Sequence, residues 1–244
     1  MTPKEWALDR VNTLVDGGWS VEAACAKVSV EEGAAEGDLL LAYESQFDSH
    51  VPRAEPAHRL PDDQKKMTTP KIEIAIEDIA KQPSCVAVVN SANSNLRLGS
   101  GVAGAIHMAA GPELEDYCEP FAPLALGKAI ITPGFNLPNK WVIHLRSAHY
   151  LNDDEPENVM REAVISMLAI VGTNQIPSIA VPAIGTGVFK FPPALAAEII
   201  ANTLGEFSES LAPCLERVRV CLASPALVPI FTEAFQRADF GIVS

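Results

Sequence analysis

Two glycine-rich segments have the residue types and spacing that suit binding of phosphate groups. The first runs from Leu98 to Gly104 and holds three glycines within six residues, directly before an expected helix. Without a Cβ in the way, successive backbone N–H groups there can approach an anion, and the positive end of the helix dipole adds to the attraction. This pattern indicates a phosphate-binding loop.

The second segment, Ile179 to Phe189, is an apolar strand that opens into a Gly185-Thr186-Gly187 turn before another expected helix. Backbone donors facing the first loop would suit a pyrophosphate, whose two phosphates need contacts from both sides. Phe189 would then cover a sugar. Either loop alone is a weak signal, because Gly-x-Gly turns also form wherever a strand reverses tightly. Neither matches the G-x-G-x-x-G dinucleotide pattern or the Gly-Lys-Ser/Thr pattern of nucleotide hydrolases.

His107 and His144 are candidates for a general base, because histidine most often fills that role. His107 falls inside an expected helix and His144 inside an apolar strand, so both are predicted to pack rather than to catalyse. Cys85 and Cys221 also fall in strands and are predicted to be buried, which leaves no thiol nucleophile. The five cysteines have no paired spacing, which indicates reduced thiols and no structural zinc.

The elements that must position these residues begin at Lys71, where apolar strand candidates start to alternate with helical ones. This alternation predicts an α/β fold with helices on both faces of a largely parallel sheet. In such sheets ligands bind beyond the carboxyl ends of the strands, where both glycine segments fall. The expected strands are Lys71–Ile76, Cys85–Asn90, Lys128–Thr132, Trp141–Leu145, Ser178–Pro182 and Arg217–Leu222. The expected helices are Gly101–Ala110, Glu157–Val171, Pro193–Glu206 and Pro225–Arg237.

Residues 1–50 are predicted to form a small all-helical domain, beginning with a capping box at Thr2–Glu5. Gly18–Ala24 is faintly similar to a DNA-reading helix-turn-helix, but from Glu22 to Asp48 the one basic side chain is Lys27. This charge favours a docking or dimerisation module over DNA binding.

Residues 51–70 are rich in proline and poor in apolar anchors, which predicts an extended linker. The predicted domains are therefore 1–50, 51–70 and 71–244.

Composition excludes several classes of function. The chain has 244 residues, of which 48% are hydrophobic and 20% charged, so it can bury a core. A net charge of −13 repels phosphate backbones and disfavours nucleic acid as a partner. No apolar stretch is long enough to predict a membrane span and the N-terminus lacks the pattern of a secretory signal, so a cytoplasmic protein is expected.

The two glycine segments, in this order and with these flanks, resemble the macrodomain family. The resemblance covers residues 71 to about 235, and it implies a three-layer α/β/α sandwich around a mixed six- or seven-stranded sheet, with a cleft for ADP-ribose. The segments that carry it are Val89–Asn93, Gly99–His107, Gly127–Pro138, Val142–His144 and Pro182–Phe189.

The resemblance implies roles for individual residues, with no metal and no cofactor. Asp78 matches the acidic residue that accepts from the adenine amino group, and Asn93 matches the Asn that holds the distal ribose and is the predicted catalytic residue. From the residues alone, Asp78 also suits a surface or capping position and Asn93 a turn. The predicted ligand contacts are Asp78, Ile79, Ala92, Asn93, Gly99, Ser100, Gly101, Val102, Pro182, Gly185, Thr186, Gly187, Val188 and Phe189.

The chain departs from the family pattern at several places. Ala103 stands where the matching hydrolases usually carry an Asp that positions the attacking water, and its loss costs about 10²–10⁴ in rate if general-base help is essential. The resemblance also extends to family members with Ala in this loop that hydrolyse with a water held by the ligand phosphate and the Asn-bound ribose, so activity stays open. Ser100 and Lys190 replace usual glycines, and the segment around Ala223–Ser224 lacks the aromatic residue that often stacks on adenine.

The resemblance leaves three functional hypotheses. The first is hydrolysis of mono-ADP-ribosylated protein or O-acetyl-ADP-ribose at the distal ribose. The second is a non-catalytic ADP-ribose reader whose N-terminal helices recruit a protein partner. The third, a transcription regulator that couples ADP-ribose to DNA, is disfavoured by the acidic N-terminal segment.

Overall fold

The computed structural model describes residues 69–243 together with Val11, Lys27 and Val28. The chain divides into two units, Met1–Gln64 and Lys65–Ser244, and the second contains every helix and strand given below. The predicted N-terminal helical domain and most of the 51–70 linker lie outside the described residues, so the domain boundaries stay predictions.

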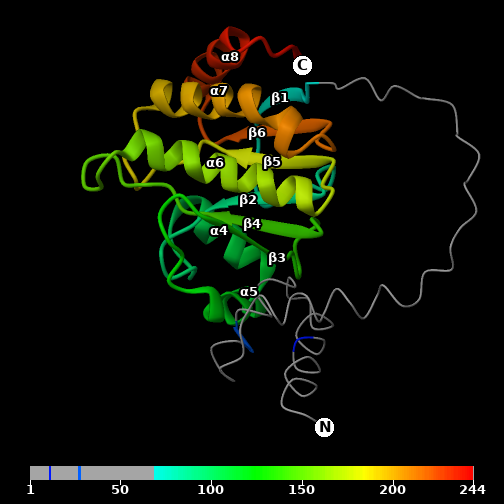
Figure 1. Ribbon diagram of the computed structural model, residues 1–244, viewed down its shortest axis with the longest axis vertical. Helices are drawn as coiled ribbons and strands as arrows, with labels where there is room; N and C mark the ends of the chain where they lie inside the picture. The colour runs from blue at the N-terminus through cyan, green and yellow to red at the C-terminus, as the bar shows by residue number, and fades with distance from the viewer. Residues whose placement is uncertain (1–10, 12–26, 29–68, 244) are drawn as a thin grey trace, which may run out of the picture. The chain divides into compact units, whose positions relative to one another are not determined.

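A seven-stranded mixed sheet forms the middle layer of the described unit (Figure 1). Its strand order is β3-β4-β2-β5-β6-β1-β7, in which β3 runs antiparallel to β4 and every other neighbouring pair is parallel. The strands are β1 (Lys71–Ile76), β2 (Ala87–Ser91), β3 (Ala129–Pro133), β4 (Trp141–Leu145), β5 (Ser178–Pro182), β6 (Arg217–Leu222) and β7 (Ile242–Val243). Because β2 and β5 are parallel neighbours near the centre, the loops that follow them meet at one edge of the sheet.

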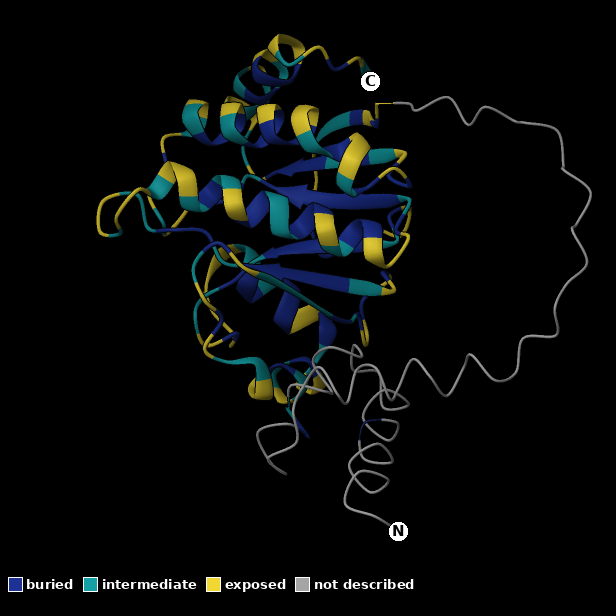
Figure 2. Ribbon diagram, in the orientation of Figure 1, coloured by how far each residue is buried: buried dark blue, intermediate teal, exposed yellow. Residues whose placement is uncertain are grey.

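Helices cover both faces of the sheet and bury one apolar stripe each. They are α4 (Gly101–Ala110), α5 (Glu113–Cys118), α6 (Pro156–Thr173), α7 (Pro193–Leu211) and α8 (Val228–Arg237), with short 3₁₀ turns at Glu119–Phe121 and Pro225–Leu227. Residues of α6, α7 and α8 share one apolar core with the sheet, whereas residues of α4 and α5 share a second core with its other face. Figure 2 shows buried central strands and exposed outward faces on α6 and α7. The three-layer α/β/α prediction is confirmed.

The observed elements differ from the expected ones mainly at their ends. β2 starts at Ala87 rather than Cys85, because the Cys85 N–H donates to the Gln82 carbonyl at 3.0 Å and closes a turn. α7 runs five residues further than Glu206, to Leu211. α8 begins at Val228, since the residues expected as its first turn form the 3₁₀ turn. α5 and β7 were not predicted.

Among the described helices, none is both long and apolar enough to cross a membrane. The four described cysteines are free and buried, as predicted for Cys85 and Cys221, although Cys85 lies in the turn before β2 rather than in the strand.

Candidate functional site

A cleft of about 290 Å³ opens where the loops after β2 and β5 face each other. One wall is the first glycine segment with the start of α4, and the other wall is the second glycine segment. The floor is made by residues at the ends of the two strands. The lining residues are Ser91, Asn93, Gly99, Ser100, Gly101, Val102, Ala103, Ala183, Gly185, Gly187, Val188 and Phe189.

The first wall leaves the N-terminal N–H groups of α4 free to meet an anion. Ser100 is the N-cap residue, but its side chain makes no capping hydrogen bond, and no acidic residue occupies the first turn. Gly101 begins the helix with φ of 60°, a left-handed conformation that favours glycine. An uncapped helix start without a carboxylate keeps its donors and its positive dipole end available to a ligand phosphate.

Asn93 holds the chain that leads into this wall. Its Oδ1 accepts from the N–H groups of Asn95 at 3.1 Å and Arg97 at 3.3 Å, and its Nδ2 donates to the Arg97 carbonyl at 2.7 Å. An Asn side chain has two N–H donors, so one remains for a ligand. Asn93 thus holds the turn and also lines the cleft, so its turn role is compatible with the ligand role, which stays a prediction.

Residues of the loop after β4 contact the second wall and hold it in place. The Tyr150 N–H donates to the Phe189 carbonyl at 2.7 Å, and the His149 ring meets the Phe189 ring edge-on at 6.4 Å between centroids. Gly185 adopts φ of 76°, and a Cβ there would approach Met160 to 2.6 Å and Phe191 to 2.8 Å. The path of this loop therefore depends on glycine at 185.

A buried polar layer fixes the strand ends beneath the cleft. The Asn90 amide lies 3.0 Å from Nδ1 of His144, whose Nε2 lies 3.0 Å from Thr132 Oγ1. Burial lowers the pKa of His144 to about 3, with the neighbouring His107 acting in the same direction. Burial also lowers the pKa of His107, against an opposing effect of the Glu115 charge. Neither histidine lines the cleft, and both are neutral at physiological pH.

Few of the side chains that line the cleft are polar. Among the described residues that line it, none carries a titratable side chain, and the polar side chains are Ser91, Asn93 and Ser100. Ala103 contributes a methyl group at the third position of α4. Within the described part of the chain, no group of three or more His, Cys, Asp and Glu side chains is placed to hold a metal ion. Burial raises the pKa of the Cys118 and Cys221 thiols to about 12, so neither is a ready nucleophile.

Comparison with known proteins identifies the family. A family model for the macro domain matches residues 89–200. A macro domain-containing protein of Ralstonia nicotianae is 38% identical over 156 residues, which are 64% of this chain and 89% of that protein. The chain belongs to the macrodomain family.

The chain is also similar to an enzyme and to a solved structure. The O-acetyl-ADP-ribose deacetylase of Shigella flexneri is 39% identical over 142 residues, which cover 56% of this chain and 80% of that enzyme. The solved macrodomain of Oceanobacillus iheyensis with ADP has a TM-score of 0.65 and 32% identity, covering 70% of this chain and 93% of that one.

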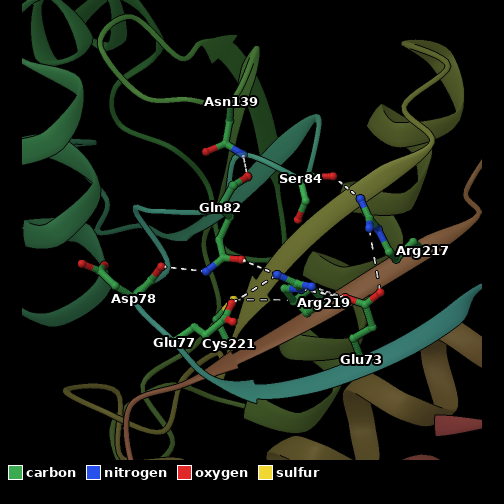
Figure 3. A network of polar contacts seen from close by, with 9 residues as sticks. All are labelled: Glu73, Glu77, Asp78, Gln82, Ser84, Asn139, Arg217, Arg219 and Cys221. Carbon is green, nitrogen blue, oxygen red and sulfur yellow. Dashed lines mark hydrogen bonds and ion pairs between the residues drawn. The ribbon is translucent and has the colours of Figure 1, made fainter. Parts of the chain in front are cut away.

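Asp78, the residue predicted to read adenine, does not line the macrodomain cleft. Its Oδ1 accepts from the Ala80 N–H at 3.0 Å and its Oδ2 lies 3.3 Å from Lys81 Nζ, while its side chain is 46% exposed. Figure 3 shows the surrounding network, in which Gln82 donates to the Asp78 carbonyl and accepts from Arg219. The network anchors the turn after β1, and the adenine role stays a prediction.

The remaining predicted residues divide between cleft and core. Ile79, Ala92 and Pro182 are buried, and Thr186 donates its hydroxyl to the Ala183 carbonyl at 2.8 Å. None of these four lines the cleft. The other predicted residues of the two glycine loops line it, and so does Asn93. Two floor residues, Ser91 and Ala183, were not among the predicted contacts. The parallel pairing of β2 with β5 was the signal that could have found them.

Proposed function

We propose that this macrodomain binds ADP-ribose and hydrolyses its adducts, mono-ADP-ribosylated protein or O-acetyl-ADP-ribose, at the distal ribose. The observation that carries the proposal is the facing pair of glycine loops, one of them an uncapped helix start, around a 290 Å³ cleft. Two walls of backbone donors match the two phosphates of a pyrophosphate. The similarity to the Shigella O-acetyl-ADP-ribose deacetylase and to the Oceanobacillus macrodomain solved with ADP supports the same ligand class.

In this proposal the loops hold the diphosphate and Asn93 donates its remaining N–H to a distal ribose hydroxyl. Phe189, held by Tyr150, lies against that ribose. Hydrolysis then depends on orientation of substrate and water and on charge stabilisation by fixed backbone dipoles, rather than on a titrating side chain of the cleft.

One observation favours a second candidate, a non-catalytic ADP-ribose reader. Among the described residues that line the cleft, none carries a carboxylate or imidazole that could act as a general base, and Ala103 stands where the resemblance leads one to expect an Asp. Without such a base, binding and turnover are separate properties that need separate measurements.

Calorimetric titration with ADP-ribose followed by a hydrolysis assay on the same sample tests both candidates. We expect saturable binding and release of acetate from O-acetyl-ADP-ribose or of ADP-ribose from a modified carboxylate. Asn93→Ala should lower turnover, whereas Asn174→Ala, at the exposed end of α6, is the matched control outside the cleft. Binding without turnover on either substrate would leave the reader, and absence of binding would remove both.

A further inference from the structure

Ser91 occupies the floor of the cleft between the two glycine walls. It is the last residue of β2, and β2 pairs in parallel with β5 through Ala87–Ile179 and Val88–Ala180. This pairing ends at Val88–Ala180, and three residues further along each chain Ser91 and Ala183 both line the cleft. A ligand that touches both walls therefore passes close to Ser91.

The hydroxyl of Ser91 makes no hydrogen bond with any other residue in the described part of the chain. Two other polar side chains near the cleft, those of Thr186 and Asn93, are more engaged. Thr186 donates to the Ala183 carbonyl, and three of the four hydrogen-bonding positions of the Asn93 amide serve the turn. Ser100 belongs to the wall at the start of α4, where a phosphate would sit. Ser91 is thus the available side-chain hydroxyl on the floor.

The backbone that carries Ser91 is held in place on both sides. Ser91 pairs with Leu145 of β4, and the next N–H, that of Ala92, donates to the Leu145 carbonyl at 2.8 Å. The preceding residue, Asn90, is held by His144 in the buried polar layer. A hydroxyl on such a rigid strand end can orient a small molecule without the entropic cost of ordering a loop.

We propose that the Ser91 hydroxyl orients the water that attacks the adduct. The inference rests on the proposed hydrolase function. Ser91 accepts a hydrogen bond from the water and so directs the water oxygen toward the acyl carbon of O-acetyl-ADP-ribose. A bond forms between that oxygen and the acyl carbon, the bond from the acyl carbon to the ribose oxygen breaks, and a water proton passes to the ribose oxygen. The products are acetic acid and ADP-ribose, and the serine keeps its own proton.

The test compares kcat on O-acetyl-ADP-ribose with the Kd for ADP-ribose, measured by calorimetry, in three serine variants. Ser91→Ala should lower kcat about 10–100-fold through loss of water orientation while the Kd changes less than about twofold. Ser91→Thr restores a hydroxyl and should recover most of the lost kcat. Ser210→Ala, on the exposed side of α7, is the matched control and should match the unmodified chain.

Three results would overturn the inference while leaving the hydrolase proposal intact: Ser91→Ala with unchanged kcat, a fall in kcat matched by an equal rise in Kd, or no recovery in Ser91→Thr. Binding without turnover in the unmodified chain would remove the hydrolase proposal and this inference together. Absence of ADP-ribose binding would instead show that the ligand assignment itself is wrong.

Discussion

At the scale of single residues, Gly187 is the cleft glycine that has both room for a side chain and a backbone conformation that any residue adopts. A Cβ at this position meets no atom within 4 Å, and the backbone is outside the left-handed region. We therefore expect Gly187→Ala to leave the free energy of unfolding within about 0.5 kcal/mol of its original value. Because the added methyl group enters the cleft, the Kd for ADP-ribose should rise about tenfold by calorimetry.

Gly241 offers the matched control for this experiment. It too has no atom within 4 Å of a built Cβ, and it does not line the cleft. Gly241→Ala should change neither stability nor affinity. If the two variants bind ADP-ribose with equal Kd, no part of the ligand lies close to Gly187.

Ala103 is the residue at which a base can be restored. It lines the cleft at the third position of α4, where the helix dipole favours a negative side chain and no other acid is present. If hydrolysis is limited by the missing base, Ala103→Asp should raise kcat on O-acetyl-ADP-ribose about 10²-fold. The rate of the variant should also fall at acidic pH, where its new carboxylate is protonated.

Ala103→Asn separates charge from shape in this test, because the amide has the size of the carboxylate but cannot accept a proton. It should show neither the gain in kcat nor the new pH dependence. A gain of the same size in both variants would point to packing or solvent access rather than to base catalysis.

At the scale of elements, the first glycine wall depends on close packing between α4 and the loop before it. A Cβ on Gly104 would lie 2.5 Å from the Gly99 carbonyl oxygen, which is closer than real contacts allow. Gly104→Ala should therefore displace the loop, lower stability by about 1–3 kcal/mol and weaken ADP-ribose binding. Denaturant unfolding and calorimetry measure the two effects.

Gly205 on α7 is the helical control, since a Cβ at this position would lie 3.6 Å from its nearest neighbour, an ordinary contact. Gly205→Ala should be neutral or stabilise the chain by up to about 1 kcal/mol through helix propensity. Comparable destabilisation of both variants would contradict the steric explanation for Gly104.

The polar layer between β2, β3 and β4 makes stability depend on pH. Burial lowers the pKa of His144 to about 3 from an ordinary 6.5, so below pH 6.5 the unfolded chain binds a proton that the folded chain refuses. The stability that the folded chain gains from keeping His144 neutral is fully present above pH 6.5. The free energy of unfolding then falls by up to about 1.4 kcal/mol per pH unit as the pH decreases toward 3. His144→Gln cannot titrate, so its stability deficit should narrow between pH 7.5 and 5 in denaturant unfolding. A constant deficit over that range would contradict this prediction.

Sequence periodicity predicted most of these elements, because the long apolar strands and helices bury a continuous face. It did not predict α5, whose six residues after Gly111-Pro112 are too short to show a helical period and carry three acidic side chains in the first turn. β7 has two residues and forms through its pairing with β1, a long-range contact that local pattern does not encode.

At the scale of the whole molecule, glycine spacing predicted the two loops that form the walls of the candidate site. The prediction was incomplete at the floor, which is formed by residues at the ends of the strands. Ser91 and Ala183 are small residues with no chemical signal of their own, and strand pairing brings them together. Asp78 follows β1, which lies beyond β5 and β6 from β2, and its carboxylate accepts from the turn after that strand, while its adenine role stays a prediction. Motifs therefore identified the walls, and topology had to supply the rest.

If the proposed function holds, a cleft that attracts a diphosphate without a basic side chain has a consequence for ionic strength. The chain carries a net charge of −13, and no Lys or Arg is among the described residues that line the cleft. A diphosphate must approach through a repulsive field, whose reach shrinks from about 30 Å at 0.01 M salt to about 8 Å at 0.15 M. Added salt should therefore speed association in stopped-flow measurements, the opposite of its effect on sites built from basic side chains. Slower association would indicate that Lys190 or Arg97, beside the two loops, steers the ligand inward.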